Sequence, residues 1–414
     1  MRPTPKPSSA DCSAAEENDS VMPHAALSPA ARTYQVQGSA IRALLKVTQQ
    51  PGVISLGGGM PSPASFPIDA LREAYDAELA ENGPAAVQYS TTEGEAPLRE
   101  WVAERETAKG VPTDPDQVLI TAGSQQALDL LAKAFVEPGA PVLVQSPTYL
   151  GALQAFSAFE PDYRIVDLDD EGFGRETIDA GLLDGARFMY IMCNFQNPTG
   201  GTLTEACRQA VAERAGLDDF WLVEDDPYGD LWYRTPPPPS LRTWAPERTI
   251  RMSSFSKILA PGLRLGYVVA PPEAIELLAR LKQATDLQTS TLTQRAAARV
   301  LRSGLLTEHL PRIREIYAVQ CAAMLEALEA SMPAGVGWSR PDGGMFVWVT
   351  LPEHLDSLAL LEAAVKRGVI FAPGNGFYAM KPALNTLRLS FSTVPPDKIR
   401  TAVGILADLI RAAI

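Results

Sequence analysis

Residues 249–270 read TIRMSSFSKILAPGLRLGYVVA and contain two β-rich runs, at 249–256 and 265–270. The link between the two runs is KILAPGLR (257–264). Parallel neighbours in a sheet need a crossover of about a dozen residues or more, usually a helix, and this link has no room for one. We therefore expect one of these two strands to run antiparallel to the sheet that contains it.

Five further strand-like runs precede this pair, and helical patterns lie between several of them. The runs are QVLIT (117–121), PVLVQSP (141–147), YRIVDLD (163–169), RFMYIMCNF (187–195) and FWLVEDD (220–226). Helical spacing of apolar residues marks 124–135 and 204–217. Strands that alternate with helices indicate crossover connections and a mostly parallel sheet. The sequence thus predicts the α/β class, with a seven-stranded, mostly parallel sheet between helices.

The length of 414 residues exceeds the ~250–300 residues at which a single core stops growing. We predict a large domain at 66–305 and a smaller α+β domain at 306–414, to which an N-terminal arm, 35–65, belongs. The smaller domain contains strand-like runs at 343–351, 369–373 and 386–391. Residues 1–34 are rich in Pro, Ser, Ala and acidic residues without an apolar period, which predicts a disordered tail and leaves both Met1 and Met22 open as the start.

The composition argues against several functional classes. The formal net charge is −13, whereas a nucleic-acid site needs clustered Lys and Arg, so we expect no nucleic-acid partner. The four cysteines lie far apart without a CxxC pair, which predicts neither a disulfide framework nor a metal site. No apolar run approaches the length of a membrane span, so we expect no membrane partner. The sequence predicts a cytoplasmic protein that acts on small molecules.

One lysine, Lys257, stands between hydroxyl residues and a Pro-Gly turn, directly after a predicted strand. Ligands of α/β sheets bind at the carboxyl ends of the strands. A buried lysine beside other cations loses part of its charge and becomes an amine that can attack an aldehyde. Ser254, Ser256 and Arg264 are the residue types that hold a phosphate, through hydroxyls and a planar charged fork. A hydrolase nucleophile or an ion-paired surface turn would show the same serine-lysine pattern.

Two other stretches follow predicted strands and suit such a site. In ITAGSQQALDL (120–130) the strand passes through Gly123, Ser124 and Gln125 into a helix, whose free N–H groups and dipole suit a phosphate. An ordinary serine cap is the alternative. NFQNPTGG (194–201) contains an Asn-Pro turn, which is also common in loops without a function.

A third stretch, VEDDPYGDLWY (223–233), ends an apolar strand in three acidic residues. A carboxylate directed at a pyridine nitrogen keeps that nitrogen protonated, and the protonated ring withdraws electrons from a substrate carbanion. Solvated loop charges are the alternative. The sequence alone does not choose among Glu224, Asp225 and Asp226 for this role.

The motifs GSQQALD, SPTY, NPTGG, EDDPY and SFSKxxxPGLRLGY occur in this order along the chain. From about Ser39 to the C-terminus, the sequence resembles class I/II aminotransferases of the fold type I that binds pyridoxal 5'-phosphate (PLP). Within this family the closest likeness is to the 2-aminoadipate (kynurenine/aminoadipate) transaminase branch, on residues 41–67 and 88–94. The resemblance implies transfer of an amino group from a 2-aminoadipate-like, aromatic or aliphatic α-amino acid to 2-oxoglutarate by a ping-pong mechanism.

The resemblance also implies roles for the cofactor residues. Lys257 would form a Schiff base with PLP and shuttle the substrate proton, and Asp225 would contact the pyridine nitrogen. Tyr228 and Asn197 would bind the phenolic oxygen, and Tyr149 would stack on the ring, although an aromatic residue at a helix start more often packs in the core. The remaining cofactor contacts implied in the same chain are Gly123, Ser124, Gln125, Ser254, Ser256 and Arg264.

Substrate contacts and the oligomer follow from the same resemblance. Arg388, with Asn197, would bind the substrate α-carboxylate. The glycines 57–59, with Gly58 as the substrate contact, would allow a close backbone approach, with an ordinary flexible loop as the alternative. Arg42 would bind a distal carboxylate, or it is a charged face of an N-terminal helix. Tyr89 would reach the phosphate of a neighbouring subunit, which implies a homodimer with shared active sites.

Two alternatives stay open at this point. A lyase, decarboxylase or synthase could use the same cofactor and fold, because the reaction depends on which bond the site holds perpendicular to the ring. A transcription regulator with an aminotransferase-like domain is a poorer fit, because the segment before Ser39 is short, proline-rich and net acidic.

Overall fold

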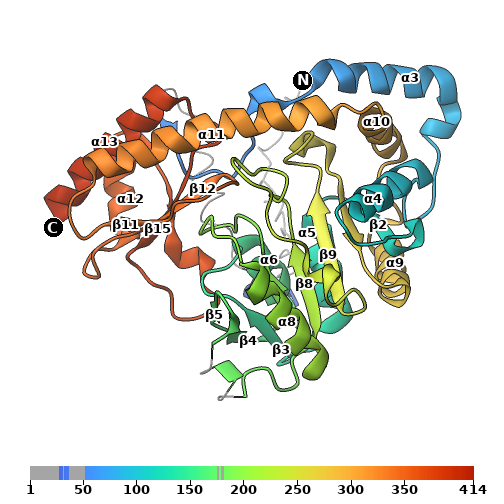
Figure 1. Cartoon of the computed structure of the whole chain (residues 1–414), viewed down its shortest axis with the longest axis horizontal. Coiled ribbons are helices and arrows are strands. Elements are labelled where there is room, and N and C mark those ends of the chain that lie inside the picture. The colour runs from blue at the N-terminus through green and yellow to red at the C-terminus, as the bar shows by residue number, and fades with distance from the viewer. Residues whose placement is uncertain (1–27, 31, 37–51, 175–176, 179–180) are drawn as a thin grey trace, which may run out of the picture.

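A seven-stranded sheet forms the centre of the computed structural model, with the strand order β2-β10-β9-β8-β7-β3-β4 (Figure 1). The structure describes residues 28–30, 32–36, 52–174, 177–178 and 181–414. The seven strands are β2 (Val118–Thr121), β3 (Pro141–Val144), β4 (Asp162–Ile165), β7 (Phe188–Ile191), β8 (Trp221–Asp225), β9 (Thr249–Ser254) and β10 (Gly266–Val269). Each of them lies in or at the edge of one of the predicted runs, so the predicted sheet is confirmed.

Strand β10 runs antiparallel to both of its neighbours, β9 and β2, and the other neighbouring pairs are parallel. The short link after β9 makes only a turn and the 3-10 helix η4 (Pro261–Leu263) before the chain re-enters the sheet. The prediction of one antiparallel strand is therefore correct, and its cause is the length of this link.

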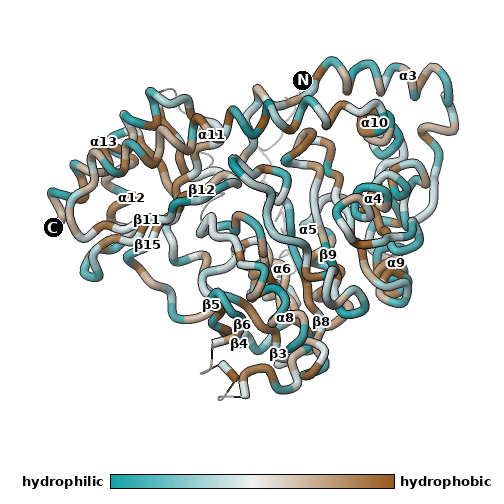
Figure 2. Tube along the Cα trace, viewed as in Figure 1, coloured by the Kyte–Doolittle hydropathy of each residue, from teal (hydrophilic) through white to brown (hydrophobic). Residues whose placement is uncertain are grey.

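Figure 2 shows that the central strands consist mostly of apolar residues, and both faces of the sheet pack against helices in apolar cores. On one face Tyr190, Val223 and Met252 pack in the same core as α5 and α6. On the other face Met189 and Leu222 pack against α8. The helices flanking this sheet are α3 (Ile68–Ala86), α4 (Ala96–Ala108), α5 (Ser124–Phe135), α6 (Leu150–Ser157), α8 (Glu205–Leu217), α9 (Pro272–Asp286) and α10 (Thr291–Arg302). Burial on two faces explains why these strands are continuous apolar runs in the sequence.

A second, four-stranded sheet has the order β11-β12-β15-β14 and is antiparallel. Figure 1 shows the long helix α11 reaching from beside α10 to this sheet, where it packs along α13. The elements of this part are α11 (Leu306–Ser331), β11 (Gly337–Trp338), β12 (Phe346–Thr350), α12 (Ser357–Lys366), β13 (Val369–Ile370), β14 (Ala372–Pro373), β15 (Thr386–Ser390) and α13 (Pro396–Ala413). The fold class is thus α/β with a smaller α+β part, as predicted.

Short elements complete the architecture. The sequence did not predict β1 (Ile54–Ser55), which pairs in parallel with β13 and so ties the segment before α3 to the smaller part. The pair β5 (Leu168–Asp169) and β6 (Gly172–Phe173) forms a small hairpin. Within the tail predicted to be disordered, the described residues include one helical turn, α1 (Arg32–Gln35). The predicted domain boundaries at 66 and 305 stay predictions. No helix within the described residues combines the length and apolarity needed to cross a bilayer.

Candidate active site

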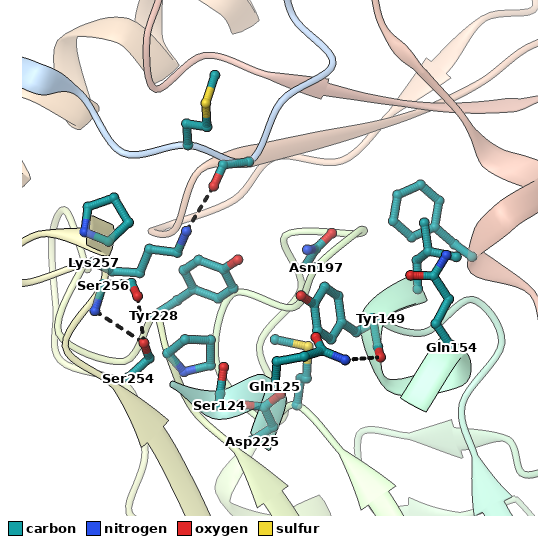
Figure 3. Close-up of a pocket in the computed structure, with 18 of the residues that line it drawn as sticks. Ser124, Gln125, Tyr149, Gln154, Asn197, Asp225, Tyr228, Ser254, Ser256 and Lys257 are labelled. Carbon is teal, nitrogen blue, oxygen red and sulfur yellow. Dashed lines mark hydrogen bonds between the residues drawn. The ribbon is translucent and has the colours of Figure 1, made fainter. Parts of the chain in front are cut away.

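A cavity of about 360 Å³ lies where β8 and β9 end at their carboxyl sides (Figure 3). The two sheets both contribute to it, because Arg388 comes from β15 of the smaller sheet. The predicted residues that line this cavity are Ser124, Gln125, Tyr149, Asn197, Asp225, Tyr228, Ser254, Ser256, Lys257, Arg264 and Arg388. Predicted residues as distant in sequence as Ser124 and Arg388 therefore meet in one cavity.

Lys257 projects into the cavity from the turn after β9. Its Nζ donates a hydrogen bond to the Gly59 carbonyl oxygen at 2.8 Å, the contact drawn above Lys257 in Figure 3. Desolvation lowers the pKa of Lys257 to about 8, and the positive charges of Arg388 and Arg264 act in the same direction. A substantial fraction of this amine is therefore neutral near physiological pH, as a nucleophile requires.

The start of α5 and the turn around Arg264 form one end of the cavity. Gly123, just before α5, has a φ of +82°, and a Cβ at this position would lie 2.7 Å from Arg264 Nη2. Ser254 Oγ donates to Ser256 Oγ at 2.9 Å and accepts from the Ser256 backbone N–H at 3.1 Å. Helix N–H groups, two hydroxyls and a guanidinium thus converge on a small space, which is the donor set that binds a phosphate.

The carboxylate question left open by the sequence is decided by the pleat of β8. Asp225 lines the cavity, whereas Glu224 and Asp226 bind the buried Arg251 at 3.1 Å and 2.8 Å on the opposite face. Successive side chains of a strand point to opposite faces, so only one of the three acids reaches the cavity.

The cavity-facing carboxylate is buried and incompletely paired. Asp225 Oδ2 accepts a hydrogen bond from the Tyr190 hydroxyl at 2.7 Å, while Oδ1 has no hydrogen-bond partner. Burial raises the pKa of Asp225 to about 7. A buried oxygen without a donor is costly, so this geometry favours a ligand that brings one.

Arg388 forms the opposite end of the cavity. Its Nη1 donates to Asn197 Oδ1 at 2.7 Å and its Nη2 donates to the Gly57 carbonyl oxygen at 2.6 Å. The guanidinium carbon lies 4.3 Å from the Phe346 ring centroid and 5.0 Å from that of Phe377. Burial lowers the pKa of Arg388 to about 10, which still leaves it charged at neutral pH. A planar, desolvated guanidinium of this kind suits bidentate binding of a carboxylate.

Two tyrosines lie between these ends. Burial raises the pKa of Tyr228 above its usual value, and a hydrogen bond with Asn197 opposes this shift, so the phenol stays protonated at neutral pH. The Lys257 amine lies 5.9 Å from the centroid of the Tyr228 ring. Tyr149 lines the cavity from the start of α6.

Among the residues that the structure describes, the predicted Gly123, Gly58 and Tyr89 do not line the cavity. Gly123 lies directly before the lining residue Ser124, and Gly58 lies between two glycines whose carbonyls bind Arg388 and Lys257. A Cβ at Gly58 would touch only the Met60 side chain, at 3.5 Å, so close packing does not require a glycine there. Tyr89 is 79 % exposed and lies on the surface of the chain. Arg42 lies outside the described residues.

Sequence reasoning missed several contributors. Gly59 belongs to the predicted glycine loop 57–59, and the lining residues not predicted are Met60, Leu150, Gly151, Gln154, Met192, Pro227, Pro261 and Phe377. Tyr190, which binds Asp225, was also missed. The alternation of RFMYIMCNF could have placed Tyr190 on the same face as the cavity residue Met192. Phe377 gave no signal, because its position depends on how the smaller sheet packs. Among the described residues, no group of His, Cys, Asp or Glu side chains could hold a metal ion.

Comparison with known proteins shows the family of this chain. A model of the family described as aminotransferase class I and II matches residues 51–406. The chain belongs to this family. It is 42 % identical over 387 residues to aromatic-amino-acid aminotransferase 1 of Thermococcus litoralis, covering 91 % of this chain and 92 % of that one. It is 41 % identical over 382 residues to 2-aminoadipate transaminase of Thermus thermophilus, covering 91 % and 95 %.

A solved structure agrees with both relatives. Pyrococcus horikoshii kynurenine aminotransferase, in complex with PMP, superimposes with a TM-score of 0.88 at 41 % identity and covers 93 % of this chain and 97 % of that one. The chain is a PLP-dependent aminotransferase of fold type I, in the branch that contains the 2-aminoadipate transaminases. The residues present fit this cofactor, because the unpartnered Asp225 Oδ1, the donor set beside Gly123 and the partly neutral Lys257 all face the same cavity.

Proposed function

We propose that this aminotransferase moves the amino group of a 2-aminoadipate-like, aromatic or aliphatic α-amino acid to 2-oxoglutarate by a ping-pong mechanism, with Lys257 as the central catalytic residue. The observation that carries this proposal is the single cavity in which Lys257, Asp225, Arg264 and Arg388 meet. A lysine nucleophile, a carboxylate, a phosphate-binding guanidinium and a carboxylate-binding guanidinium together account for PLP and an α-amino acid.

Each residue has a distinct task in this proposal. Bound PLP supplies an electron-withdrawing ring that stabilises negative charge at the substrate Cα. Lys257 Nζ would hold the cofactor, and it is placed to take up the substrate Cα proton and return it to the cofactor. Its lowered pKa suits that work, since a base is most effective with a pKa near the working pH. Asp225 Oδ1 accepts the hydrogen bond of the ring nitrogen, and Tyr228 and Asn197 bind the phenolic oxygen.

The phosphate and the ring are held by the remaining cofactor residues. Tyr149 packs on the ring. The proposed phosphate ligands are Ser124, Gln125, Ser254, Ser256 and Arg264, with Gly123 leaving room for the guanidinium.

Arg388 binds the substrate α-carboxylate by exchanging its present partners. The guanidinium donates to two neutral oxygens, one from Asn197 and one from Gly57. A carboxylate offers two charged acceptors in the same plane, so a bidentate pair adds the attraction of opposite charges to the two hydrogen bonds. The exchange therefore favours the substrate.

The side chain of the donor is limited by the described lining. Met60, Leu150 and Phe377 provide apolar surface. Within the described part of the chain, the cations on this lining are Lys257, Arg264 and Arg388, and all three have other tasks. Aromatic and aliphatic donors therefore fit the described lining, and a dicarboxylic donor depends on Arg42. One of the two relatives is named for aromatic amino acids and the other for 2-aminoadipate, which are the same two classes.

The proposal includes a cytoplasmic homodimer with shared active sites. Tyr89 is a large aromatic residue that is mostly exposed on a single chain, and Val87 beside it is 65 % exposed, which suits a surface covered by a second copy. Cys193, Cys207 and Cys321 are free and buried, which is compatible with a reducing compartment.

An amino-donor panel with 2-oxoglutarate tests the proposed function. The wild type is expected to use aromatic, aliphatic and dicarboxylic donors. Arg42→Ala is expected to lose activity on dicarboxylic donors selectively, and Arg280→Ala, which removes an exposed ion pair on α9, is the matched control. Lys257→Ala is expected to lose turnover. Equal loss on all donors in Arg42→Ala would contradict the substrate assignment, and release of ammonia or pyruvate without keto-acid dependence would favour a lyase.

A further inference from the structure

Tyr190 lies in the middle of β7, and its hydroxyl contacts the carboxylate that faces the cavity. The hydroxyl donates to Asp225 Oδ2 at 2.7 Å, and both side chains are buried. Oδ1 of the same carboxylate is buried and has no partner. Tyr190 is not among the residues that line the cavity. The hydroxyl therefore binds Oδ2 from the side away from the cavity, and Oδ1 stays available to a ligand in the cavity.

The fold fixes the position of this hydroxyl. Tyr190 pairs with Val223 in the parallel register of β7 and β8, and Val223 lies on the same face of β8 as Asp225. The Tyr190 ring packs edge-to-face on Phe156, with ring centroids 5.7 Å apart and an interplanar angle of 78°. Sheet register and ring packing together leave the hydroxyl little freedom. A phenylalanine would fill the same space, so the ring packing alone does not explain the hydroxyl.

We propose that Tyr190 is a positioning residue for amino transfer, whose hydroxyl holds the Asp225 carboxylate turned so that Oδ1 can accept the hydrogen bond of the cofactor ring nitrogen. This inference rests on the proposed role of Asp225. It adds a residue behind the cofactor site that acts only through that carboxylate.

The electrostatic surroundings show why a donor is needed at this position. Burial raises the pKa of Asp225 to about 7, the Tyr190 hydrogen bond opposes the rise, Asp226 adds to it, and Arg251 opposes it. Without the hydroxyl, the remaining balance moves the pKa of Asp225 further upward. The carboxyl group would then be mostly neutral at pH 7 and would no longer favour a protonated ring nitrogen.

The tyrosine itself remains a donor over the working pH range. Burial raises the pKa of Tyr190 well above its usual value, and the charge of Asp225 acts in the same direction. The neighbouring phenols of Tyr149 and Tyr228 also raise it. The phenol therefore stays protonated, and the shared hydrogen bond has a fixed direction from Tyr190 to Asp225.

The test compares Tyr190→Phe with Tyr163→Phe and Asp225→Asn. Tyr163 lies on β4 of the same sheet, donates to the Leu153 carbonyl oxygen at 3.1 Å and does not line the cavity, so its variant controls for loss of a tyrosine hydroxyl. The dissociation constant of PLP from the cofactor-free protein and the kcat/KM profile are measured from pH 6 to pH 9. Tyr190→Phe is expected to bind PLP roughly tenfold more weakly at pH 7. The acid limb of its kcat/KM profile should move to higher pH by roughly one unit, because the free energy of a hydrogen bond to a charged group corresponds to about a tenfold change in an equilibrium constant.

The outcomes separate this inference from the proposed function. Recovery of Tyr190→Phe toward the wild type at pH 9 supports the role, because a distorted site would not recover. If Tyr190→Phe matches Tyr163→Phe in both measurements while Asp225→Asn loses PLP affinity, the role of Tyr190 is overturned and that of Asp225 stands. If Asp225→Asn also matches the wild type, the role of Asp225 is wrong. Urea unfolding midpoints verify that each variant folds. If Tyr190→Phe does not fold, Tyr190→Met takes its place under the same criteria, because methionine fills the space without a hydroxyl.

Discussion

Asp225 and Asp226 are consecutive residues at the end of β8, and their carboxylates lie on opposite faces of the sheet. Asp225 faces the cavity with one oxygen unpaired, while Asp226 is bound to Arg251. One acid is therefore available to a ligand, and its neighbour is committed to the fold. The same dipeptide thus contributes both to function and to stability.

The network around Arg251 yields a stability prediction. Its Nε, Nη1 and Nη2 bind Glu106, Glu224 and Asp226, and all four side chains are buried. Arg251→Met leaves three buried carboxylates without their cation, and breaking a buried pair in this way costs about 3–5 kcal/mol. We expect a loss of that size in the free energy of unfolding, measured with urea.

The matched control for Arg251→Met is Arg280→Ala. Arg280 pairs with Glu276 on α9, and both side chains are exposed. Such a pair contributes about 0.3–0.5 kcal/mol. Similar losses in the two variants would contradict the importance of the buried network.

The same network predicts the acid behaviour of the protein. Burial alone would raise the pKa of Glu106 and Asp226, but the charge of Arg251 lowers both below their usual values. Carboxyls with lowered pKa values stabilise the fold above their unfolded values, 4.5 and 3.8, and this contribution is lost as the pH falls through the folded values. In Arg251→Met the buried carboxyls have raised pKa values instead, so protonation relieves them.

We therefore expect the stability gap between the wild type and Arg251→Met to shrink as the pH falls from 7 toward 4. Urea unfolding at several pH values measures the gap. A gap that widens on acidification would show that Arg251 does not hold these carboxyls ionised.

Lys257 gives a prediction for the pH dependence of cofactor binding. The rate of covalent attachment of PLP to the cofactor-free protein, followed by absorbance, should rise with pH and level off above a midpoint near 8, because only the neutral amine reacts. After burial, the charge of Arg388 is the next cause of the lowered pKa. Arg388→Gln should therefore move the midpoint to higher pH. Lys257→Ala is the blank, and an unchanged midpoint in Arg388→Gln would argue against electrostatic coupling across the cavity.

Arg388→Lys tests the geometry of substrate binding. Lysine keeps the charge but cannot form two parallel hydrogen bonds, so one charge-assisted bond is lost. A loss of about 1.5–3 kcal/mol corresponds to a KM roughly 10- to 100-fold higher for both the amino acid and the keto acid. PLP affinity should stay close to that of the wild type, since the proposed phosphate ligands lie at the other end of the cavity. A parallel loss of PLP affinity would indicate a general collapse of the site.

The sequence predicted the sheet well because the features that indicate each strand lie within that strand or in the link beside it. Buried parallel strands are continuous apolar runs, and the length of KILAPGLR fixed the direction of β10. It predicted eleven of the residues that line the cavity, because many of them follow strand ends in recognisable motifs. It could not choose Asp225 over its neighbours without the family resemblance. Alternation assigns the three acids to two faces of the strand, but it does not show which face borders the cavity until the covering helices are placed.

The contributors that were missed depend on contacts distant in sequence. Phe377 reaches the cavity from the smaller part. The glycines 57–59 were expected to allow a close backbone approach, but the carbonyl contacts of Gly57 with Arg388 and of Gly59 with Lys257 were not predicted, because any residue has a carbonyl. Tyr190 looks like a core residue in a strand until β7 is placed beside β8. Periodicity could have placed Tyr190 on one face of its strand with Met192, but neither composition nor periodicity shows which distant elements meet at the cavity.

Gly123 provides a steric test of the phosphate end. It has a φ of +82°, and an added Cβ would lie 2.7 Å from Arg264 Nη2, so Gly123→Ala should displace the guanidinium that we propose as a phosphate ligand. Losing one charge-assisted contact predicts PLP binding about 10- to 100-fold weaker. Gly139→Ala is the matched control, because Gly139 also has a positive φ, +78°, but an added Cβ would meet nothing within 4 Å.

Both glycine variants should lose stability, by about 1–3 kcal/mol, because an L side chain at these φ values strains the backbone. Only Gly123→Ala should also lose PLP affinity, which fluorescence titration of the cofactor-free protein measures. The difference between the two variants isolates the crowding of Arg264 from the backbone strain they share. Equal PLP affinity in both variants would mean that Arg264 can move away without loss, and the assignment of Arg264 as a phosphate ligand would then be wrong.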